Sequence, residues 1–447
     1  MSQTTKRLTG AAALLLPTLC LMAAGAANAQ DAAPALLGHQ AALELDSAGA
    51  SWLGTSTALV LLMTLPGLAL FYGGMVRKKN VIATITQSVG VFAVVSLVWF
   101  IAGYSLAFGK NESAGLQPFI GSLDMLFLNG VSLKTANALL PGIPEFLFIS
   151  FQMTFAIITP ALITGAFAER FKYSALLLFT ALWSLLVYAP ICHWVWGGGF
   201  LGSAGVLDFA GGAVVHVNSG VAGLVCAIFL GRRKGYGTEV ITAHNPVLTM
   251  IGASLLLVGW IGFNAGSAGA ANDLMGVALL NTILAAAAAA LTWKIVEYIE
   301  KKKVSLIGML SGVVVGLVAI TPAAGFVDPK GAVIIGLIAG PACYASSVWI
   351  KKLLRYDDSL DAFGIHGAGG LIGALLTGVF ATTAINSLSE GANVGAQALG
   401  LLWTIVYSAV GTLIILFICK FTTGLRVSEA EEAAGLDTSL HGEALEH

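Results

Sequence analysis

The stretch VIATITQSVGVFAVVSLVWFIAGYSLAF, from Val81 to Phe108, contains no charged residue. A helix needs about 20 mainly apolar residues to cross the ~30 Å hydrocarbon core of a bilayer, and this stretch is long enough. The basic residues Arg77, Lys78 and Lys79 stand shortly before it. Apolar runs and short basic connections alternate along the whole chain, which predicts an all-α polytopic membrane protein.

Eleven stretches of the chain have the length and composition of a membrane-spanning helix. Their approximate limits are Trp52–Tyr72, Val81–Phe108, Phe146–Ala168, Ser174–Val195, Ala210–Leu230, Asn245–Ala265, Leu274–Tyr298, Val304–Pro322, Ala332–Ile350, Asp361–Ala381 and Ala398–Cys419. We therefore expect a transmembrane domain over residues 51–420 and a tail over residues 421–447.

Basic residues cluster after every odd-numbered span as far as the ninth. These residues are Arg77, Lys78, Lys79, Arg170, Lys172, Arg232, Arg233, Lys234, Lys301, Lys302, Lys303, Lys351, Lys352 and Arg355. Cytoplasmic loops of membrane proteins are enriched in Lys and Arg. The pattern predicts an inner-membrane protein with a periplasmic N-terminus and a cytoplasmic tail.

The composition supports a chain whose outer surface faces lipid. Of 447 residues, 57% are hydrophobic and 10% are charged, whereas soluble domains carry roughly 25% charged residues. The net charge of -1 gives no reason to expect a nucleic-acid partner. Cysteines at 192, 226, 343 and 419 lie in apolar stretches without a disulfide pattern, so we expect small core side chains.

The N-terminus resembles a secretory leader. Lys6 and Arg7 precede an apolar run from Leu8 to Ala24, and Ala27-Asn28-Ala29 provides small residues for cleavage. We expect a cleaved signal peptide over residues 1–29 and a periplasmic segment over residues 30–50. The alternative is an additional transmembrane helix.

The eleven spans divide into two groups of five and one final span. A repeat with an odd number of spans must be inverted, so we predict inverted repeats over about residues 51–235 and 244–383. Spans five and ten each hold one glycine-flanked histidine, His216 and His366. Inverted repeats typically place the substrate path at their interface near the bilayer midplane.

Each of these histidines lies on a stripe of small residues. Gly212, His216 and Gly220 share one helix face, and glycines at 369, 370 and 373 lie on the side of His366. Ionisable groups inside spans usually line a path or a packed interior, so the alternative is a pair of hydrogen-bonded core histidines. No further ligand with suitable spacing lies nearby, so we expect no metal and no cofactor.

Aromatic residues form a second candidate site towards the outer ends of the spans. Trp260, Phe263 and Ser267 share one face of span six, Phe155 lies within span three, and Trp196 ends span four. A cation between such rings gains about 0.5–2 kcal/mol. The alternative for each tryptophan is an interfacial anchor.

Two aspartates stand at the starts of the histidine-bearing spans. Asp208 precedes span five and Asp361 opens span ten. Each is first interpreted as an N-cap, whose carboxylate accepts from the first free amides of the helix. Asp208 could also stabilise a nearby cation.

These motifs together closely resemble the Amt ammonium transporter family, and its bacterial AmtB group in particular. The resemblance covers the chain from about Trp52 to Glu443. The matching stretches are Phe151-Gln152 with Phe155, Gly165–Arg170, His193–Gly199, Asp208–Gly212 with His216, Gly262–Ser267, Asp361–Gly367 and, in the tail, Gly424–Glu429, Gly435–Asp437 and His441–Glu443.

The resemblance implies a homotrimer in which each protomer has its own pore. It implies an outer ammonium site made by Trp196, Phe155 and Ser267, with Asp208 as a required support. It also implies a PII-type signal protein, GlnK-like, as a cytoplasmic partner.

The resemblance further implies that Phe155 and Phe263 form a gate and that His216 and His366 form the pore pair. Trp260 and Asp361 are expected to support the site. Moving a bare cation into such an apolar passage costs on the order of several kcal/mol. Moving neutral ammonia costs far less. We expect deprotonation at the gate, and the paired imidazoles favour net movement of charge by a proton relay.

Two other classes of function are weighed against transport. A sensor would use the same pore and signal through a bound partner, because the tail is too short for a kinase or cyclase domain. An intramembrane hydrolase would need a catalytic motif, and the sequence has neither Gly-x-Ser-x-Gly nor His-Glu-x-x-His. We therefore expect a transporter and not an enzyme.

Overall fold

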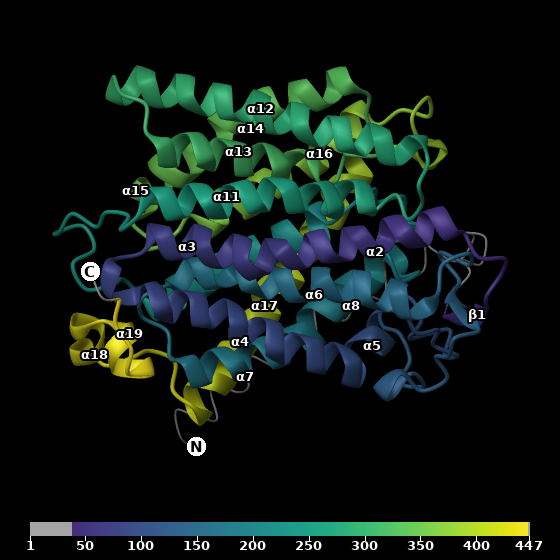
Figure 1. Ribbon diagram of the computed structural model, residues 1–447, viewed down its shortest axis with the longest axis horizontal. Coiled ribbons are helices and arrows are strands. Elements are labelled where there is room, and N and C mark those ends of the chain that lie inside the picture. Colours follow the sequence, from purple (N-terminus) through teal and green to yellow (C-terminus); the bar gives the residue numbers. More distant parts are fainter. Residues whose placement is uncertain (1–37, 446–447) are drawn as a thin grey trace.

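The computed structural model describes residues 38–445, so the expected signal peptide lies outside the described residues. Long helices run roughly side by side along one direction (Figure 1). At one end of this bundle, β1 (His39–Ala41) pairs antiparallel with β2 (Thr135–Asn137). At the other end lie α18 (Glu429–Ala434) and α19 (Leu436–His441). We call these the β1 end and the tail end.

Ten helical stretches among the described residues are long and apolar enough to cross a membrane. They are Ser47–Met75, Lys78–Phe108, Glu145–Phe167, Tyr173–Ser203, Gly212–Leu230, Pro246–Ala265, Asp273–Lys301, Pro329–Leu354, Phe363–Phe380 and Val394–Thr422. The shorter apolar helix α13 (Leu306–Ile320) corresponds to the remaining expected span. The chain is thus a multi-pass helical membrane protein, as predicted, and an eleventh crossing depends on α13.

Most of these stretches consist of one or two α-helices joined to a short π-helical segment. The α-helices are α2 (Ser47–Leu62), α3 (Ala69–Met75), α4 (Val81–Val98), α5 (Tyr104–Phe108), α6 (Glu145–Phe167), α7 (Tyr173–Trp183), α8 (Ala189–Val195), α9 (Phe200–Ser203), α10 (Asn218–Leu230), α11 (Pro246–Trp260), α12 (Asp273–Lys301), α14 (Pro329–Tyr344), α15 (Lys351–Leu354), α16 (Ala368–Phe380) and α17 (Val394–Thr422). The π-helical segments are Met63–Leu68, Trp99–Gly103, Ser184–Tyr188, Gly212–Val217, Ile261–Ala265, Ala345–Ile350 and Phe363–Gly367.

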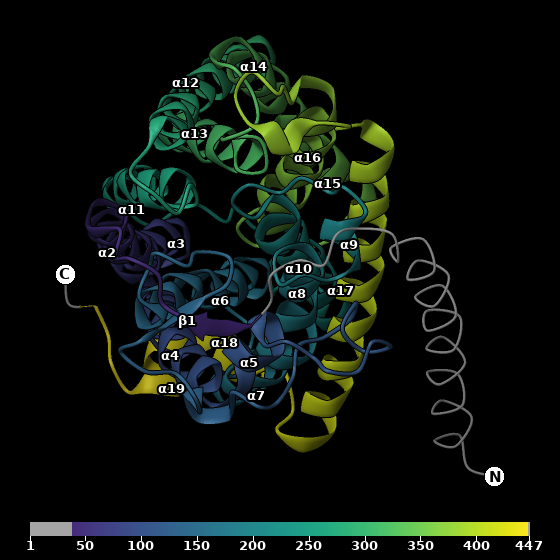
Figure 2. The ribbon, with the colours of Figure 1, turned by 90° about the vertical axis from the view of Figure 1, so that its right-hand side faces the viewer.

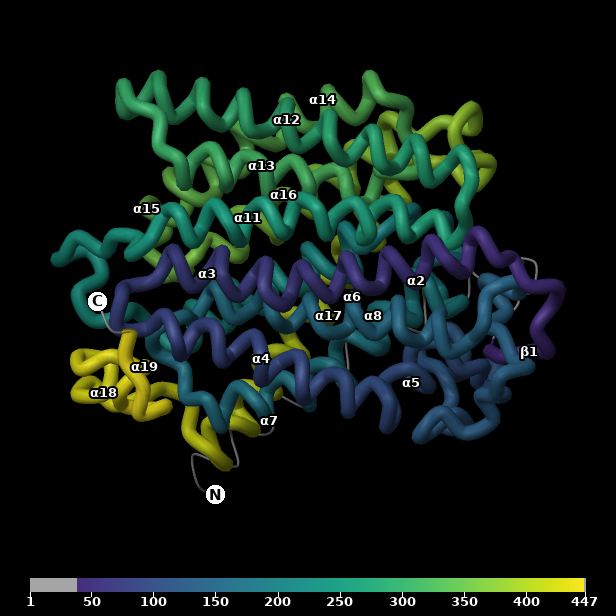
Figure 3. Tube along the Cα trace, in the orientation of Figure 1, coloured from purple at the N-terminus to yellow at the C-terminus, as the bar shows by residue number. Residues whose placement is uncertain are grey.

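Neighbouring helices approach closely where one of them carries glycine. α11 packs against α3, and a Cβ on Gly252 would overlap the backbone of Phe71. α13 packs against α16, and a Cβ on Gly373 would overlap the Ala319 carbonyl. Small residues let membrane helices pack backbone to backbone, which explains the high glycine content. The tube in Figure 3 shows α11 running beside α2 and α3.

The outward faces of the helices carry large apolar side chains. Leu291 and Ile299 of α12 and Leu402 of α17 are each more than half exposed. Figure 2 shows α12 and α17 on the outside of the bundle. Such a surface is suited to lipid contact. The cysteines at 192, 226, 343 and 419 are buried and unpaired, as predicted.

The C-terminal tail folds back onto the helical bundle. The side chain of Asp437 accepts from the Ala83 amide at 2.8 Å, and the Leu436 amide donates to the Asn80 side chain at 2.9 Å. A capping box at Ser428 and Glu431 starts α18. These contacts hold the tail against the first turn of α4.

Candidate functional site

The two histidines predicted from the sequence lie together inside the bundle. His216 is on the π-helical segment Gly212–Val217, which leads into α10, and His366 is on Phe363–Gly367, which leads into α16. Their exposed fractions are 1% and 4%. The ring centroids are 5.3 Å apart and the rings are nearly parallel, at 21°.

Glycines make this approach possible. A Cβ added to Gly220 of α10 would overlap the backbone of Gly367, and one added to Gly370 of α16 would lie 2.8 Å from the Gly212 carbonyl oxygen. The two helices therefore touch through their backbones four residues before and four residues after His216. The predicted stripes of small residues are the surfaces that meet.

A continuous row of rings extends from the histidine pair towards the β1 end. The centroid of His216 is 5.9 Å from that of Phe263, Phe263 is 4.3 Å from Phe155, and Phe155 is 5.9 Å from Trp196. We call the five residues from Trp196 to His366 the ring row. Phe155 and Phe263 are at most 1% exposed, and their rings are tilted by 32° and in contact, so the two phenylalanines close the row in this structure.

Trp260 and Ser267 support the row from α11 and the turn after it. Trp260 stacks on His216 with centroids 5.4 Å apart, and its Nε1 donates to the Thr321 hydroxyl at 2.9 Å. Ser267 is half-buried, and its hydroxyl donates to the Phe263 carbonyl at 2.8 Å. Because the proton of Ser267 is directed into the helix, its oxygen lone pairs are available as acceptors.

Three of the four imidazole nitrogens of the pair are buried without protein partners among the described residues. Neither Nδ1 nor Nε2 of His216, and not Nδ1 of His366, has a hydrogen-bond partner among the described residues. Buried polar groups are normally paired, and leaving one unpaired costs about 1–3 kcal/mol. Among residues 38–445, no protein group makes the hydrogen bonds to these three nitrogens that the alternative of hydrogen-bonded core histidines would require. Within residues 38–445 no group of three His, Cys, Asp or Glu side chains could hold a metal.

Asp208 caps the segment that carries His216. Its carboxylate accepts from the amides of Gly211, Ala213 and Val214 at 2.8–3.0 Å, and from that of Gly212. Burial raises the pKa of Asp208, although these four hydrogen bonds favour the carboxylate. Its carbonyl oxygen accepts from Nε1 of Trp196 at 2.8 Å, so the same residue fixes the indole at the end of the ring row.

The cap expected at Asp361 is made instead by Asp358. The Asp358 carboxylate accepts from the amides of Ala362 and Phe363 at 3.0 and 2.8 Å. Asp361 forms an ion pair with Lys351. The prediction was wrong because Asp361, although it directly precedes the helix, has a positive φ of 60° and pairs with Lys351 instead of with the helix amides. Burial, and then the charge of Asp361, raise the pKa of Asp358 to about 6.

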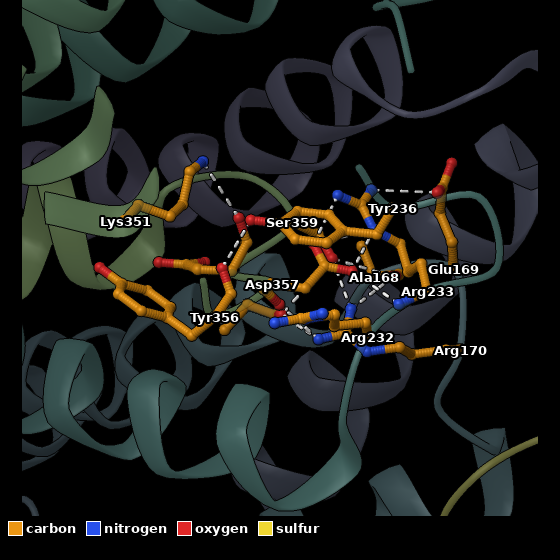
Figure 4. Close-up of polar contacts among 12 residues, drawn as sticks. Ala168, Glu169, Arg170, Arg232, Arg233, Tyr236, Lys351, Tyr356, Asp357 and Ser359 are labelled. Atoms are coloured by element: carbon orange, nitrogen blue, oxygen red, sulfur yellow. Dashed lines mark hydrogen bonds and ion pairs between the residues drawn. The ribbon is translucent and has the colours of Figure 1, made fainter. Parts of the chain in front are cut away.

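A buried ion network lies beside this cap at the tail end (Figure 4). Glu169 pairs with Arg77 at 2.9 Å and with Arg233 at 3.1 Å, and Arg233 also pairs with Asp357 at 2.8 Å. Arg170 donates to the Asp357 carbonyl at 2.6 Å. Burial alone would raise the pKa of Glu169, but the two arginines reverse this and lower the pKa.

Asp358 and Lys351 shape the tail end as a helix cap and an ion-pair partner, and neither was given such a role from the sequence. Three carboxylates stand within Asp357-Asp358-Ser359-Leu360-Asp361, and the sequence does not show which of them faces the helix amides and which faces a lysine. Lys351 belongs to a basic cluster whose members look equivalent in sequence.

Fold and site together define a membrane transport protein. A bundle of apolar helices encloses a row of aromatic rings and two buried imidazoles. The model of the Ammonium Transporter Family matches residues 51–445. The chain belongs to this family, whose members are transporters and not enzymes.

Proteins from distant organisms are similar over most of the chain. An ammonium transporter of Aquifex aeolicus is 48% identical over 406 residues, covering 90% of this chain and 93% of the relative. The crystal structure of Saccharomyces cerevisiae Mep2 has a TM-score of 0.79 at 36% identity, covering 86% and 88% of the two chains. A solved structure named Sensor Amt Protein has a TM-score of 0.80 at 32% identity, covering 88% and 98%.

Proposed function

We propose that the chain transports ammonium across the inner membrane, taking up the ion at the β1 end and releasing it at the tail end. The observation that carries this proposal is the ring row, which ends in two buried imidazoles with unpaired nitrogens. Membership of the family and the names of the relatives support ammonium as the substrate.

The recruitment site in this proposal consists of Trp196, Phe155 and Ser267. Ring faces attract any small cation, and this attraction is worth about 0.5–2 kcal/mol. Ammonium differs from potassium in donating hydrogen bonds, and the Ser267 oxygen can accept one because its own proton is donated to Phe263. Asp208 adds a buried negative group at the same end, held by its four amides.

Passage beyond the site takes place as neutral ammonia. Phe155 and Phe263 form the gate. Moving a bare cation past these two buried rings would cost on the order of several kcal/mol. A neutral imidazole both donates and accepts, so His216 and His366 can hold ammonia and pass a proton between them. We propose that the proton follows this relay, so that transport carries net charge.

The arrangement in the membrane follows from the charges. The basic loops lie at the tail end, which we propose is cytoplasmic, with a periplasmic N-terminus. We further propose inverted repeats over about residues 51–235 and 244–383, a homotrimeric assembly and a GlnK-like PII partner at the cytoplasmic face. The last two are supported by the family resemblance.

The test of the site is the uptake of labelled methylammonium in cells that lack their own transporters. His216→Ala and Phe263→Ala should each reduce uptake, or its selectivity over potassium, by roughly tenfold or more. A tenfold change corresponds to about 1.4 kcal/mol. Phe179→Ala is the matched control, because Phe179 is equally buried but lies off the ring row. Normal selective uptake by both site variants, at equal protein levels, would remove the proposed roles.

Trp196→Leu separates the recruitment site from a membrane anchor. We expect the concentration for half-maximal uptake to rise while the thermal stability of the purified protein stays near that of the wild type. Unchanged kinetics would favour the anchor. Currents from reconstituted protein at defined ammonium gradients test the relay, and verified uptake without current would exclude net charge movement.

A sensor is the second candidate function. The similarity to the Sensor Amt Protein structure favours it, and the tail contacts the first turn of α4 directly. A variant that abolishes uptake but preserves an ammonium-dependent signal through a bound partner would support sensing in this chain.

A further inference from the structure

The turn that carries Trp196 depends on His193, a residue that has no role in the proposed function. His193 lies on α8, three residues before Trp196, and it is 0% exposed. Its carbonyl oxygen accepts from the amides of Gly197 and Gly199 at 3.0 and 2.9 Å. The backbone of His193 thus closes the glycine turn in which α8 ends, and Trp196 lies within this turn.

The ring of His193 faces two backbone carbonyls from other parts of the chain. Nδ1 is 2.9 Å from the Ala107 oxygen near the end of α5, and Nε2 is 2.6 Å from the Gln117 oxygen in the loop that follows α5. Among the described residues, the other group near Nε2 is the Gln117 side-chain amide, whose nitrogen is 3.5 Å away. Both short contacts of the ring are therefore contacts with hydrogen-bond acceptors.

These two contacts determine how many protons the ring needs. A carbonyl oxygen only accepts, and a neutral imidazole has one N–H donor and one acceptor nitrogen. A neutral His193 would therefore direct one nitrogen lone pair at a carbonyl oxygen, and that contact would be repulsive. The ring donates to both Ala107 and Gln117 only when both nitrogens carry a proton, which makes it an imidazolium.

No acidic side chain compensates this charge directly. Within residues 38–445, no carboxylate lies within ion-pair distance of the His193 ring. The titratable and charged groups on α8, on the elements packed against it and on the loops that join them are Tyr104, Lys110, Glu112, Tyr188, Cys192, Asp208, His216 and Tyr407. Burial disfavours the charged ring and the two carbonyls favour it. Because these effects oppose each other, the ring can release a proton as pH rises.

Residues 117–119 of the outer loop lie along α8 and the turn after it. Their three consecutive carbonyl oxygens contact, in order, the His193 ring, the Phe200 amide at 3.0 Å and Nε1 of Trp194 at 2.7 Å. The amide and the indole keep their protons at any physiological pH, whereas the imidazole does not. His193 is therefore the pH-sensitive member of the three contacts that hold this loop.

Trp196 lies directly beside the contacts of the His193 ring. A Cβ on Gly197 would overlap the Ala107 carbonyl, which is the oxygen that faces Nδ1 of His193. The Trp196 indole is fixed at its other end by the Asp208 carbonyl at 2.8 Å. If the ring released either carbonyl, the backbone of the glycine turn could shift, and the indole would shift with it.

We propose that His193 is a positioning residue of the recruitment site, and that Trp196 keeps the described geometry while both ring nitrogens of His193 carry a proton. This inference rests on the proposed function, because it assigns recruitment to Trp196. Loss of one proton leaves one of the two carbonyls without its donor and loosens the turn. Recruitment of ammonium therefore weakens as pH rises, whereas passage through the ring row does not depend on His193.

The pH dependence of uptake tests this proposal. Initial rates of labelled methylammonium uptake are measured in proteoliposomes with equal pH inside and outside, in steps from about pH 5 to about pH 8, where histidine changes its charge. In the wild type, the concentration for half-maximal uptake should rise severalfold over this range while the maximal rate changes little. In His193→Gln that concentration should be raised at every pH and nearly independent of pH. The control His244→Gln, which changes an exposed histidine at the tail end, should behave as the wild type.

Trp194→Phe separates the charge of the ring from the docking of the loop. It removes the donor to residue 119 but leaves both contacts of the His193 ring. We expect a higher concentration for half-maximal uptake that still rises with pH. No rise with pH in the wild type, a rise retained in His193→Gln, or a rise lost in Trp194→Phe would each overturn the proposal.

Nitrogen NMR of the wild type provides a measurement that needs no variant. The protein is produced with isotope-labelled histidine, and the ring signals are assigned through the backbone of residue 193. We expect two protonated ring nitrogens at about pH 5 and one at about pH 8. One unprotonated ring nitrogen over the whole range would overturn the proposal. If the protein took up no methylammonium at all, the proposed function would fail, and the NMR signals would still decide the protonation of His193.

Discussion

The helices that carry His216 and His366 start at opposite ends of the bundle, and their first turns are stabilised differently. At the β1 end, Asp208 satisfies four backbone amides and has no cationic side chain within ion-pair distance among residues 38–445. At the tail end, Asp358 satisfies two amides beside an Asp361–Lys351 pair and a buried ion network. Both helices thus start with a buried aspartate cap, but the two caps lie in different electrostatic environments.

The difference matters for a transported cation. The charge of Asp208 is spread over amide dipoles and no side chain cancels it, so it favours a cation near Trp196. At the tail end the anions lie close to Lys351 and three arginines, Arg77, Arg170 and Arg233, and their fields largely cancel. Under the proposed function, the entry side attracts the ion and the exit side does not retain it.

The largest effect is expected from breaking the tail-end network. Glu169→Gln leaves Arg77 and Arg233 without their shared carboxylate, and removing one partner of a buried pair costs about 3–5 kcal/mol. The thermal unfolding midpoint of the purified protein should fall clearly. Glu443→Gln, at an exposed position of the tail, is the control. An unchanged midpoint would mean that the network contributes little to stability.

A smaller loss is expected from the cap at the β1 end. Asp208→Ala removes the acceptor of four amides, and loss of an N-cap costs about 0.5–2 kcal/mol. The Trp196 indole bonds to the backbone of residue 208 and should keep its place, which intrinsic fluorescence can follow. Stability equal to the wild type would show that water replaces the carboxylate without cost.

The smallest effect is expected at the tail-end cap, and its sign depends on pH. Asp358→Asn loses part of a two-amide cap, which lowers the free energy of unfolding. It also removes a buried carboxylate with a raised pKa, which raises the free energy of unfolding at neutral pH, so the two effects oppose each other. An acid whose pKa is raised to about 6 on folding stabilises the protein at low pH and loses that contribution as pH rises through 6. The advantage of the wild type over Asp358→Asn should therefore shrink between about pH 4 and pH 6. A constant difference across this range would contradict the assignment.

Acidification should weaken the network that Glu169→Gln breaks. Burial raises the pKa values of Glu169 and Asp357, but the neighbouring arginines lower both below the ordinary range. Groups with lowered pKa stabilise the fold above their unfolded pKa and lose this contribution as pH falls through the folded pKa. The wild type should lose more stability on acidification below about pH 4 than Glu169→Gln does. Parallel losses in the two proteins would place the acid sensitivity elsewhere.

The sequence predicted the spans well because apolar length and basic loops are properties of single segments. It also predicted the small stripes around His216 and His366, since glycine spacing along one helix defines a face. The choice of Asp358 over Asp361 depended on the left-handed backbone at Asp361 and on its ion pair with Lys351, which local patterns do not show. The stacking of Trp260 on His216 joins residues of two separate helices, and spacing along one helix does not predict such a contact.

The backbone contact between Gly220 and Gly367 has a consequence for how the protein tolerates mutation. Neither residue has a side chain that could meet the substrate, yet a single methyl group at position 220 would wedge the two histidine-bearing helices apart. In a saturation library selected for growth on scarce ammonium, position 220 should accept as few replacements as the histidines themselves. If position 220 tolerates few replacements, the cause is the short distance between the two helices and not a chemical role of the residue in transport.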